Sequence, residues 1–188
     1  MEGVFTWDGT LPPEIQTSWT KFVYSINVAH DIPIPRWLGI SMRSSVALHM
    51  FTDSSNLAMG CVAYLVQGKT SSFISCKAKI TPRREQHYSI PRKELTALSL
   101  GVRFIKFIHN SVKNYKTFSS IHLWSDSTTC LNWALAKQSH KELFIRARVD
   151  HLAVVVKELG IVYHYITSET NPADLLTKDS KVPIIHFG

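Results

Sequence analysis

The sequence has 188 residues, of which 45% are hydrophobic and 19% are charged, so its composition is that of a folded globular protein and not of a disordered chain. No apolar run approaches the roughly 20 residues that a membrane-spanning helix needs, and the first residues lack the basic start and apolar core of a secretory signal. Lys and Arg outnumber Asp and Glu by 21 to 14, and the net charge of +7 favours a polyanionic partner.

The first 45 residues differ in pattern from the rest. The stretch WDGTLPPEIQTSWTKFVYSI predicts a helix that begins at a proline and is apolar on one side. The prolines of DIPIPRWLGI then predict an extended connector. Residues 1–45 are interpreted either as a helix packed on the edge of the domain or as a linker from a preceding domain. The apolar side of the helix is formed by Trp19, Phe22, Val23 and Ile26.

An α/β pattern begins at Val46. The nearly continuous apolar run VALHMFTD predicts a central strand that is buried on both faces. The stretches MGCVAYLVQG and SSFISCKAKI predict two more strands, joined at Gly68, so the sheet opens as an antiparallel meander.

Helices and strands then alternate. The stretches SIPRKELTALSLGVRFIKFIHNSV, residues 127–137 and residues 141–159 predict helices, SIHLWSD and IVYHYIT predict strands, and NPADLLTK opens a last helix. The order βββαβααβα predicts an α/β fold with a five-stranded mixed sheet flanked by helices. We expect this domain to span residues 46–180, with a tail at 181–188. The buried stripe of the first of these helices is made by Leu95, Leu98, Val102 and Ile105, and that of the helix over 141–159 by Ile145, Val149, Leu152, Val156 and Leu159.

The three cysteines, Cys61, Cys76 and Cys130, are odd in number and lack metal-ligand spacing. This pattern predicts buried free thiols in a reducing compartment.

Two of the predicted strands end in an aspartate, Asp53 in FTDSS and Asp126 in LWSDS. A buried strand that is followed by a helical crossover predicts that the first and fourth strands are parallel neighbours. Their carboxyl ends would then place Asp53 beside Asp126, at the edge where open α/β sheets bind ligands. Two carboxylates at such close range repel each other unless a cation or a proton lies between them.

Glu94 and Asp174 lie near the starts of predicted helices. Taken singly, each is explained as an acid that caps a helix or is stabilised by its dipole. Glu94 shares a face with Leu98 and Ile105, however, and should therefore point toward the sheet. Four acids at strand ends and helix starts, without a Cys or His cluster, favour the hard cations Mg²⁺ or Mn²⁺. A pair of such ions roughly 3.5–4 Å apart is an arrangement that cleaves phosphodiesters.

The motifs FTDSSNLAMGCVAYL, SIPRKELTALSLGVRF, LWSDSTTCLNW and NPADLLTK resemble, in this order, those of the ribonuclease H domain of reverse transcriptases. The resemblance is closest to BEL/Pao-type LTR retrotransposons, and LPPEIQTSWTKFVYSINVAHDIPIPRWL is similar to the segment that precedes the domain in that family. It implies a two-metal-ion endonuclease that hydrolyses the RNA strand of RNA–DNA hybrids during reverse transcription. The implied cofactors are two Mg²⁺ ions, with Mn²⁺ as a substitute.

The same resemblance assigns roles to the four acids. It implies that Asp53 bridges both ions, that Asp174 completes the site on the nucleophile side, and that Glu94 and Asp126 complete the other site. The implied partners are an RNA–DNA hybrid and the polymerase domains of the same polyprotein, without a membrane. The expected location is cytoplasmic, in retroelement particles.

The sequence departs from relatives at several points. Cellular ribonucleases H carry a loop histidine before the last aspartate, whereas TSETNPAD has none. His164 is ten residues before Asp174, but it falls inside a predicted strand, where a packed or exposed histidine is favoured over a catalytic one. The basic handle helix of some cellular relatives is missing between Lys137 and Lys141, and Thr128 stands where many relatives have Gln.

Small polar side chains beside the carboxylates suit a hybrid that is recognised through 2′-hydroxyls and phosphates. Turn and cap residues are an equally good explanation for them. A solvated face is favoured for most of the basic residues in and before the first helix of the domain, and some of them are expected to touch phosphate; they are Lys77, Lys79, Arg83, Arg84, Arg92 and Lys93. A core position is favoured for Trp133 over stacking on a deoxyribose. The candidate substrate contacts are Ser54, Ser55, Asn56, Ser127, Thr128 and Arg92.

Two other functions remain open. One is a catalytically silent or domesticated module of the same fold that binds nucleic acid or a protein. The other is an integrase or transposase core, although such cores use three acids, the third being a Glu on a late helix, whereas here Asp174 follows NPA.

Overall fold

The computed structural model describes residues 9–30, 38–39, 41, 44–136 and 140–178. The chain divides into two compact units, residues 1–37 and 38–188. The first unit contains helix α1 (Pro13–His30), which confirms the helix expected there. The rings of Trp19 and Phe22, on the apolar side of α1, have their centroids 5.7 Å apart. Most of the expected connector and the predicted tail at 181–188 lie outside the described residues.

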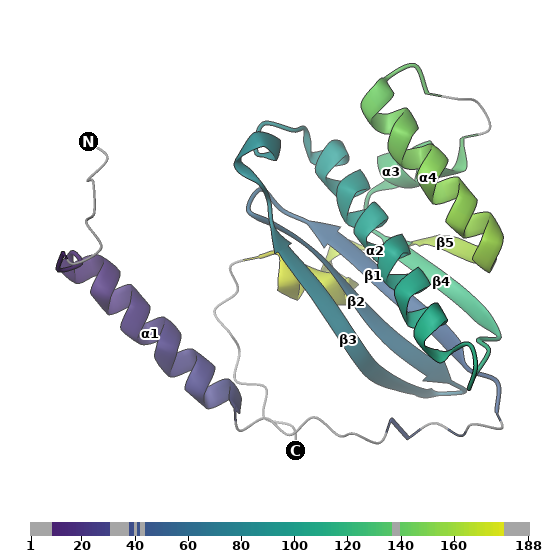
Figure 1. The fold of residues 1–188 in the computed structure, drawn as a ribbon, viewed down its shortest axis with the longest axis horizontal. Coiled ribbons are helices and arrows are strands. Elements are labelled where there is room, and N and C mark those ends of the chain that lie inside the picture. Colours follow the sequence, from purple (N-terminus) through teal and green to yellow (C-terminus); the bar gives the residue numbers. More distant parts are fainter. Residues whose placement is uncertain (1–8, 31–37, 40, 42–43, 137–139, 179–188) are drawn as a thin grey trace. The chain divides into compact units, whose positions relative to one another are not determined.

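The second unit is built on a five-stranded mixed sheet, as expected (Figure 1). Its spatial order is β3-β2-β1-β4-β5. Strands β1, β2 and β3 form the antiparallel meander, whereas β4 is parallel to both β1 and β5. The prediction that the first and fourth strands are parallel neighbours is therefore confirmed. The strands are β1 (Ala47–Ser54), β2 (Ala58–Gln67), β3 (Thr70–Ile80), β4 (Ser120–Ser125) and β5 (Ile161–Tyr165).

Within its described residues, the unit also contains three α-helices and three short 3-10 helices. The α-helices are α2 (Ile90–Val112), α3 (Thr128–Leu135) and α4 (Leu143–Leu159). The 3-10 helices are η1 (Arg83–Glu85), η2 (Ser168–Thr170) and η3 (Pro172–Leu176). None of the described helices is long and apolar enough to cross a membrane.

The stretch NPADLLTK forms the five-residue 3-10 helix η3 and not the opening of an α-helix, which corrects the prediction. Asn171 caps the turn by accepting a hydrogen bond from the Ala173 N–H. At the other end, the hydroxyl of Thr177 donates to Asp53. The same hydroxyl also lies 3.2 Å from the Asp174 carbonyl, a local bond of the kind that competes with helix continuation, and Thr177 leaves helical geometry with φ −122°.

Close packing at two glycines places α2 on one face of the sheet and η3 on the other (Figure 1). A Cβ on Gly101 of α2 would lie 2.5 Å from Thr52 Cγ2, and a Cβ on Gly60 of β2 would lie 2.7 Å from Leu176 Cβ. Because Gly60 pairs directly with Asp53 on β1, the η3 segment is brought next to this aspartate.

The predicted buried stripe of α2 is confirmed, since Leu95, Leu98, Val102 and Ile105 are fully buried. On α4, Val155 is buried whereas Val156 is only partly buried, one position away from the expected stripe. Cys76 is exposed, contrary to the expectation of three buried thiols, because β3 is an edge strand of the sheet.

Candidate active site

The first two acids lie at the carboxyl ends of two hydrogen-bonded parallel strands. Thr52 on β1 pairs with Ser125 on β4, so Asp53 and Asp126 follow at the same edge of the sheet. The Thr52 hydroxyl donates to the Trp124 carbonyl at 3.1 Å, which ties the two strands together next to the acids. Parallel pairing thus puts Asp53 beside Asp126, as the sequence predicts.

Glu94 reaches this edge from the amino-terminal part of α2, as the fifth residue of the helix. It is only 6% exposed and faces the sheet, as expected from its position on the stripe of α2. The carboxylates of Asp53, Glu94 and Asp126 each offer an oxygen, and these three oxygens lie within 4.8 Å of one another. Below, these three residues are called the carboxylate cluster.

The carboxylate cluster has the properties of a cation site. Within the described residues, Glu94 Oε2 and Asp126 Oδ1 are buried without a hydrogen-bond partner, as is the neighbouring Ser54 Oγ. A buried carboxylate oxygen without a donor is costly unless a cation or proton satisfies it. Because all the donor atoms are oxygens, the cluster suits a hard divalent cation such as Mg²⁺ or Mn²⁺.

Burial and mutual repulsion raise the pKa values of Glu94 and Asp53. Burial raises the pKa of Glu94 to about 8, and the charges of Asp126 and Asp53 add to this effect. Burial also raises the pKa of Asp53; a hydrogen bond from Thr177 acts in the opposite direction, and the charges of Asp126 and Asp174 add to the increase. In the metal-free protein, a proton on Glu94 therefore takes part of the role that a cation would have.

Asp174 lies outside the group of three. It is close enough for its charge to raise the pKa of Asp53, but it is not part of the set of oxygens within 4.8 Å. Its Oδ1 pairs at 2.5 Å with Nζ of Lys178, which is four residues further on in the sequence. The structure thus brings three of the four predicted ligands together and places the fourth nearby, in an ion pair.

Three side chains that the sequence did not single out position the cluster. Thr177 donates its hydroxyl to Asp53 Oδ2, and Ser168 donates to Asp126 Oδ2 at 2.5 Å. Asn171 Nδ2 donates to the Thr52 carbonyl at 3.0 Å and so fixes the η2–η3 segment to β1. The Asn-Pro pair at 171–172 was a visible cap signal, whereas nothing local marked Thr177 or Ser168 as partners of acids far away in the chain.

Several of the candidate substrate contacts have structural partners. The Ser55 hydroxyl accepts from the N–H groups of Leu57 and Ala58, and the Ser127 hydroxyl caps α3 by accepting from the Cys130 N–H. Both hydroxyls therefore also fill the turn and cap roles that the sequence left open. Thr128, the first residue of α3, is exposed.

Asn56 and Arg92 are engaged as well. Asn56 Oδ1 accepts from Lys93 Nζ at 3.0 Å, and this lysine is 3% exposed. Arg92 forms an ion pair with Glu142. Lys93 is thus buried and not part of the solvated face that was expected, because it also donates to the Gln86 carbonyl at 2.9 Å.

His164 lies inside strand β5, as predicted, and packs against its neighbours there. Its Nε2 is 2.8 Å from Nδ1 of His122, and its ring stacks on Trp124 with centroids 4.4 Å apart. Trp133 is partly buried against the hydrophobic core, which agrees with the core position favoured for it.

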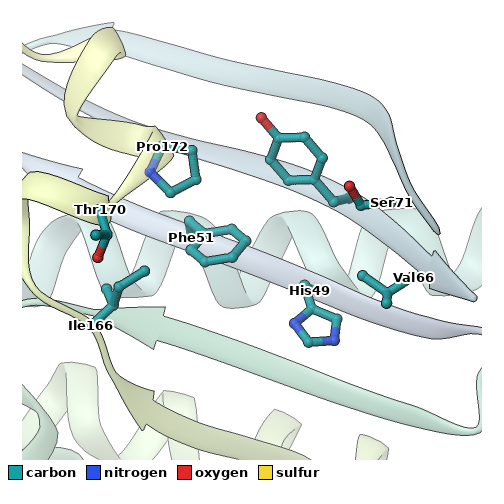
Figure 2. Close-up of a pocket in the computed structure, with 8 residues that line it drawn as sticks. His49, Phe51, Val66, Ser71, Ile166, Thr170 and Pro172 are labelled. Carbon is teal, nitrogen blue, oxygen red and sulfur yellow. The ribbon is translucent and has the colours of Figure 1, made fainter. Parts of the chain in front are cut away.

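A separate pocket lies on the sheet, lined by residues of β1, β2 and β3 and of the segment that follows β5 (Figure 2). It has a volume of about 310 Å³. Its lining is mainly apolar, and none of its lining side chains is an acid. It therefore offers no ligand for a hard cation, and the carboxylate cluster remains the candidate active site. The lining residues are His49, Phe51, Tyr64, Val66, Ser71, Ile166, Thr170 and Pro172.

The sequence matches the family model of the Pao retrotransposon-like RNaseH-like domain over residues 2–127. This match covers 126 of the 188 residues and includes Asp53, Glu94 and Asp126. No curated protein matches the sequence.

The fold is similar to solved ribonuclease H structures. The N-terminal RNase H domain of rv2228c from Mycobacterium tuberculosis is 16% identical, with 71% of this chain and 91% of that chain covered and a TM-score of 0.52. LC11-RNase H1, solved in complex with an RNA/DNA hybrid, is 12% identical, with 70% and 93% covered and a TM-score of 0.52. The foamy viral protease-reverse transcriptase, also solved with an RNA/DNA hybrid, is 12% identical, with 93% and 21% covered and a TM-score of 0.52. These likenesses establish a ribonuclease H fold.

Proposed function

Because this chain belongs to the family of Pao retrotransposon-like RNaseH-like domains, we propose that it is an endonuclease that hydrolyses the RNA strand of RNA–DNA hybrids during reverse transcription. The observation that carries the proposal is the carboxylate cluster, in which three acids meet within 4.8 Å at the edge of the sheet. Two of its buried oxygens have no hydrogen-bond partner among the described residues. Acids that were only structural would be expected to have their oxygens satisfied by protein donors.

Asp53, Glu94 and Asp126 would hold divalent cations, Mg²⁺ with Mn²⁺ as a substitute. Asp174 would join them as the fourth ligand if it exchanged its ion pair with Lys178 for a cation. Two such ions, when bound, activate a water for attack on a phosphodiester and stabilise the leaving oxygen. The protein contributes the orientation of the carboxylates, because the hydroxyls of Thr177 and Ser168 hold one oxygen each of Asp53 and Asp126.

The substrate class is supported by charge and by the structural relatives. The net charge of +7 favours a polyanion. Two of the similar structures, LC11-RNase H1 and the foamy viral protease-reverse transcriptase, were solved in complex with an RNA/DNA hybrid. The foamy viral protease-reverse transcriptase also supports the proposal that polymerase domains accompany this chain in one polyprotein.

The direct test is to incubate the purified protein with end-labelled RNA–DNA hybrid, duplex DNA and duplex RNA, each with Mg²⁺, Mn²⁺ or EDTA. We expect cleavage of the RNA strand of the hybrid alone, and only with a divalent cation. Hybrid binding without cleavage at any cation concentration would instead indicate a catalytically silent module of the same fold. Cleavage or joining of duplex DNA would indicate an integrase-like activity.

The isolated chain is expected to bind the hybrid weakly and with a steep salt dependence. We expect only a few lysines and arginines to contact phosphates, because a basic handle helix is missing from the sequence, and each such contact weakens through counterion competition as salt rises. A longer protein that includes the polymerase domains should bind more tightly, because a second contact raises the effective concentration of the hybrid. The measurement is a titration of one labelled hybrid with both proteins at several salt concentrations. Equal affinities throughout would contradict the expectation.

His164→Ala is expected to reduce cleavage by less than about threefold, because a side chain packed in β5 against Trp124 and His122 cannot move to the scissile phosphate. The measurement is kcat on the hybrid, with a thermal melt to confirm folding. A loss of more than about tenfold, which is about 1.4 kcal/mol of barrier, in a folded variant would assign this histidine a catalytic role.

A further inference from the structure

A second pocket, which unlike the first has a polar lining, lies between helices α2 and α4, away from the carboxylate cluster. It has a volume of about 200 Å³, and none of its lining side chains is an acid. Two arginines and a histidine contribute to it, one arginine from α2 and the other two side chains from α4. Its lining residues are Thr96, Ser99, Arg103, Ala147, Arg148 and His151, and they are called the α2–α4 pocket below.

The two guanidinium groups are held in place by their own helices and keep free donors. Arg148 lies over the ring of Phe144, 3.6 Å from its centroid, and its Nη1 donates to the Phe144 carbonyl. Arg103 donates through Nε to the Ser99 carbonyl at 3.2 Å. Because a guanidinium has five N–H groups, most of those on Arg103 and Arg148 remain available to a ligand.

The hydroxyls in the pocket do not compete for these donors. Ser99 Oγ donates to the Leu95 carbonyl at 2.8 Å, and Thr96 Oγ1 donates to the Arg92 carbonyl at 2.9 Å. Each hydroxyl hydrogen is therefore used within α2. The remaining donors in the pocket are N–H groups of Arg103, Arg148 and His151, and they favour a ligand that is rich in hydrogen-bond acceptors.

The pocket has an excess of positive charge. Within the described residues, neither Arg103 nor Arg148 has a carboxylate within 4.0 Å. The acid whose charge acts on Arg148 is Glu85, and its carboxylate pairs with Arg84 at 3.8 Å.

The two arginines are also close enough to repel each other. Burial lowers the pKa of Arg148, Glu85 and Tyr88 act in the opposite direction, and the charge of Arg103 lowers it further. Two like charges side by side in a pocket without an acid are stabilised by a bound anion.

We propose that the α2–α4 pocket binds a phosphate group through Arg103, Arg148 and His151. Paired guanidinium forks match the oxygens of a phosphate better than those of a halide or a single carboxylate. The phosphate would come either from the backbone of a bound nucleic acid or from free phosphate or a nucleotide. The first source rests on the proposed function, in which it would supply a second grip on the hybrid outside the active site.

The α2–α4 pocket and the carboxylate cluster lie at different positions along α2. Glu94 and Arg103 are nine residues apart on one helix, which is a rise of about 13 Å. The phosphate held in the pocket would therefore not be the one at the scissile bond. The pocket should therefore affect binding of the hybrid and leave the cleavage rate of bound hybrid unchanged.

The test compares Arg103→Gln/Arg148→Gln with a control that removes the same charge from the same helix pair, Lys113→Gln/Lys157→Gln. Both control lysines are exposed, and they lie at the carboxyl-terminal ends of α2 and α4. We expect the arginine variant to bind the hybrid about tenfold more weakly. The slope of log Kd against log salt should fall by about one to two, as for the loss of one or two phosphate contacts. KM should rise while kcat stays within about twofold, and the lysine variant should resemble the wild type.

A second variant, Arg103→Lys/Arg148→Lys, keeps the charge and removes the guanidinium fork. It should recover only part of the affinity, and thermal melts of all variants establish that they fold. Equal weakening by the arginine and lysine variants would show a diffuse charge effect and overturn the proposal.

A titration of the wild type with inorganic phosphate or a nucleoside monophosphate, followed by NMR of the arginine side-chain N–H signals, separates the two sources. Shifted arginine signals, together with unchanged hybrid binding by the arginine variant, would assign the pocket to free phosphate or a nucleotide. Unshifted signals and unchanged hybrid binding would overturn the proposal. If the wild type fails to cleave any hybrid but the arginine signals shift, the proposed function fails and the phosphate site stands.

Discussion

Asp126→Asn is expected to abolish divalent-cation-dependent cleavage of the hybrid, with a loss of about a thousandfold or more, or about 4 kcal/mol of barrier. The amide keeps the shape of the side chain and can still accept the hydrogen bond from Ser168. It removes the charge that holds a cation against Asp53 and Glu94. The measurement is the single-turnover cleavage rate with saturating protein in Mg²⁺ and in Mn²⁺.

The matched control is Asp150→Asn, which makes the same change at an exposed aspartate on α4. Its cleavage rate should remain within about twofold of the wild type. In the absence of metal, Asp126→Asn should fold at least as stably as the wild type, because one of three mutually repelling charges is gone. Substantial Mg²⁺-dependent cleavage by purified Asp126→Asn protein would refute the assignment of the carboxylate cluster as the active site.

The metal-free protein is expected to lose stability as the pH rises from about 4.5 to about 8. The pKa of Glu94 is raised from 4.5 to about 8 in the folded state, first by burial and then by the charges of Asp126 and Asp53. Between these values the folded state binds more protons than the unfolded state, so the free energy of unfolding falls with increasing pH. The loss should be on the order of a few kcal/mol. It is measured by urea unfolding in EDTA at several pH values.

Two changes should reverse this loss. Saturating Mg²⁺ at pH 8 should stabilise the wild type, because the cation replaces the proton among the carboxylates and binds only the folded state. Glu94→Gln should flatten the pH dependence in EDTA, whereas Glu169→Gln, at an exposed acid in η2, should leave it unchanged. A wild-type protein equally stable in EDTA at pH 5 and pH 8 would show that the cluster is not strained by its own charge.

Most of the fold follows from local patterns. The alternation and apolar runs of the five strands, and the stripe of Leu95, Leu98, Val102 and Ile105, each reflect which side of an element is buried. The errors lie where neighbours decide. Cys76 is exposed because β3 is at the sheet edge. Thr177 leaves helical geometry at the end of η3, where its hydroxyl bonds to Asp53 and to the Asp174 carbonyl.

The active site also contains features that the sequence predicts and features that depend on tertiary contacts. Asp53 and Asp126 could be placed together in advance, because parallel pairing after a helical crossover is a strong rule of topology. Glu94 could be oriented by its spacing from Leu98. The ion pair of Asp174 with Lys178, and the burial of Lys93 against Asn56, depend on where the surrounding turns come to rest.

The five strands, the α-helices up to α4 and the three acids at the sheet edge thus follow from periodicity and strand order in the sequence. The groups that complete the site depend on the packing of the folded chain. The hydroxyls of Ser168 and Thr177 reach Asp126 and Asp53 across 42 and 124 residues of sequence. Arg103 and Arg148 line one pocket only because α2 packs on α4. Such contacts leave no periodic signal in either partner, because they depend on the packing of segments distant in the chain and not on the conformation of either segment alone.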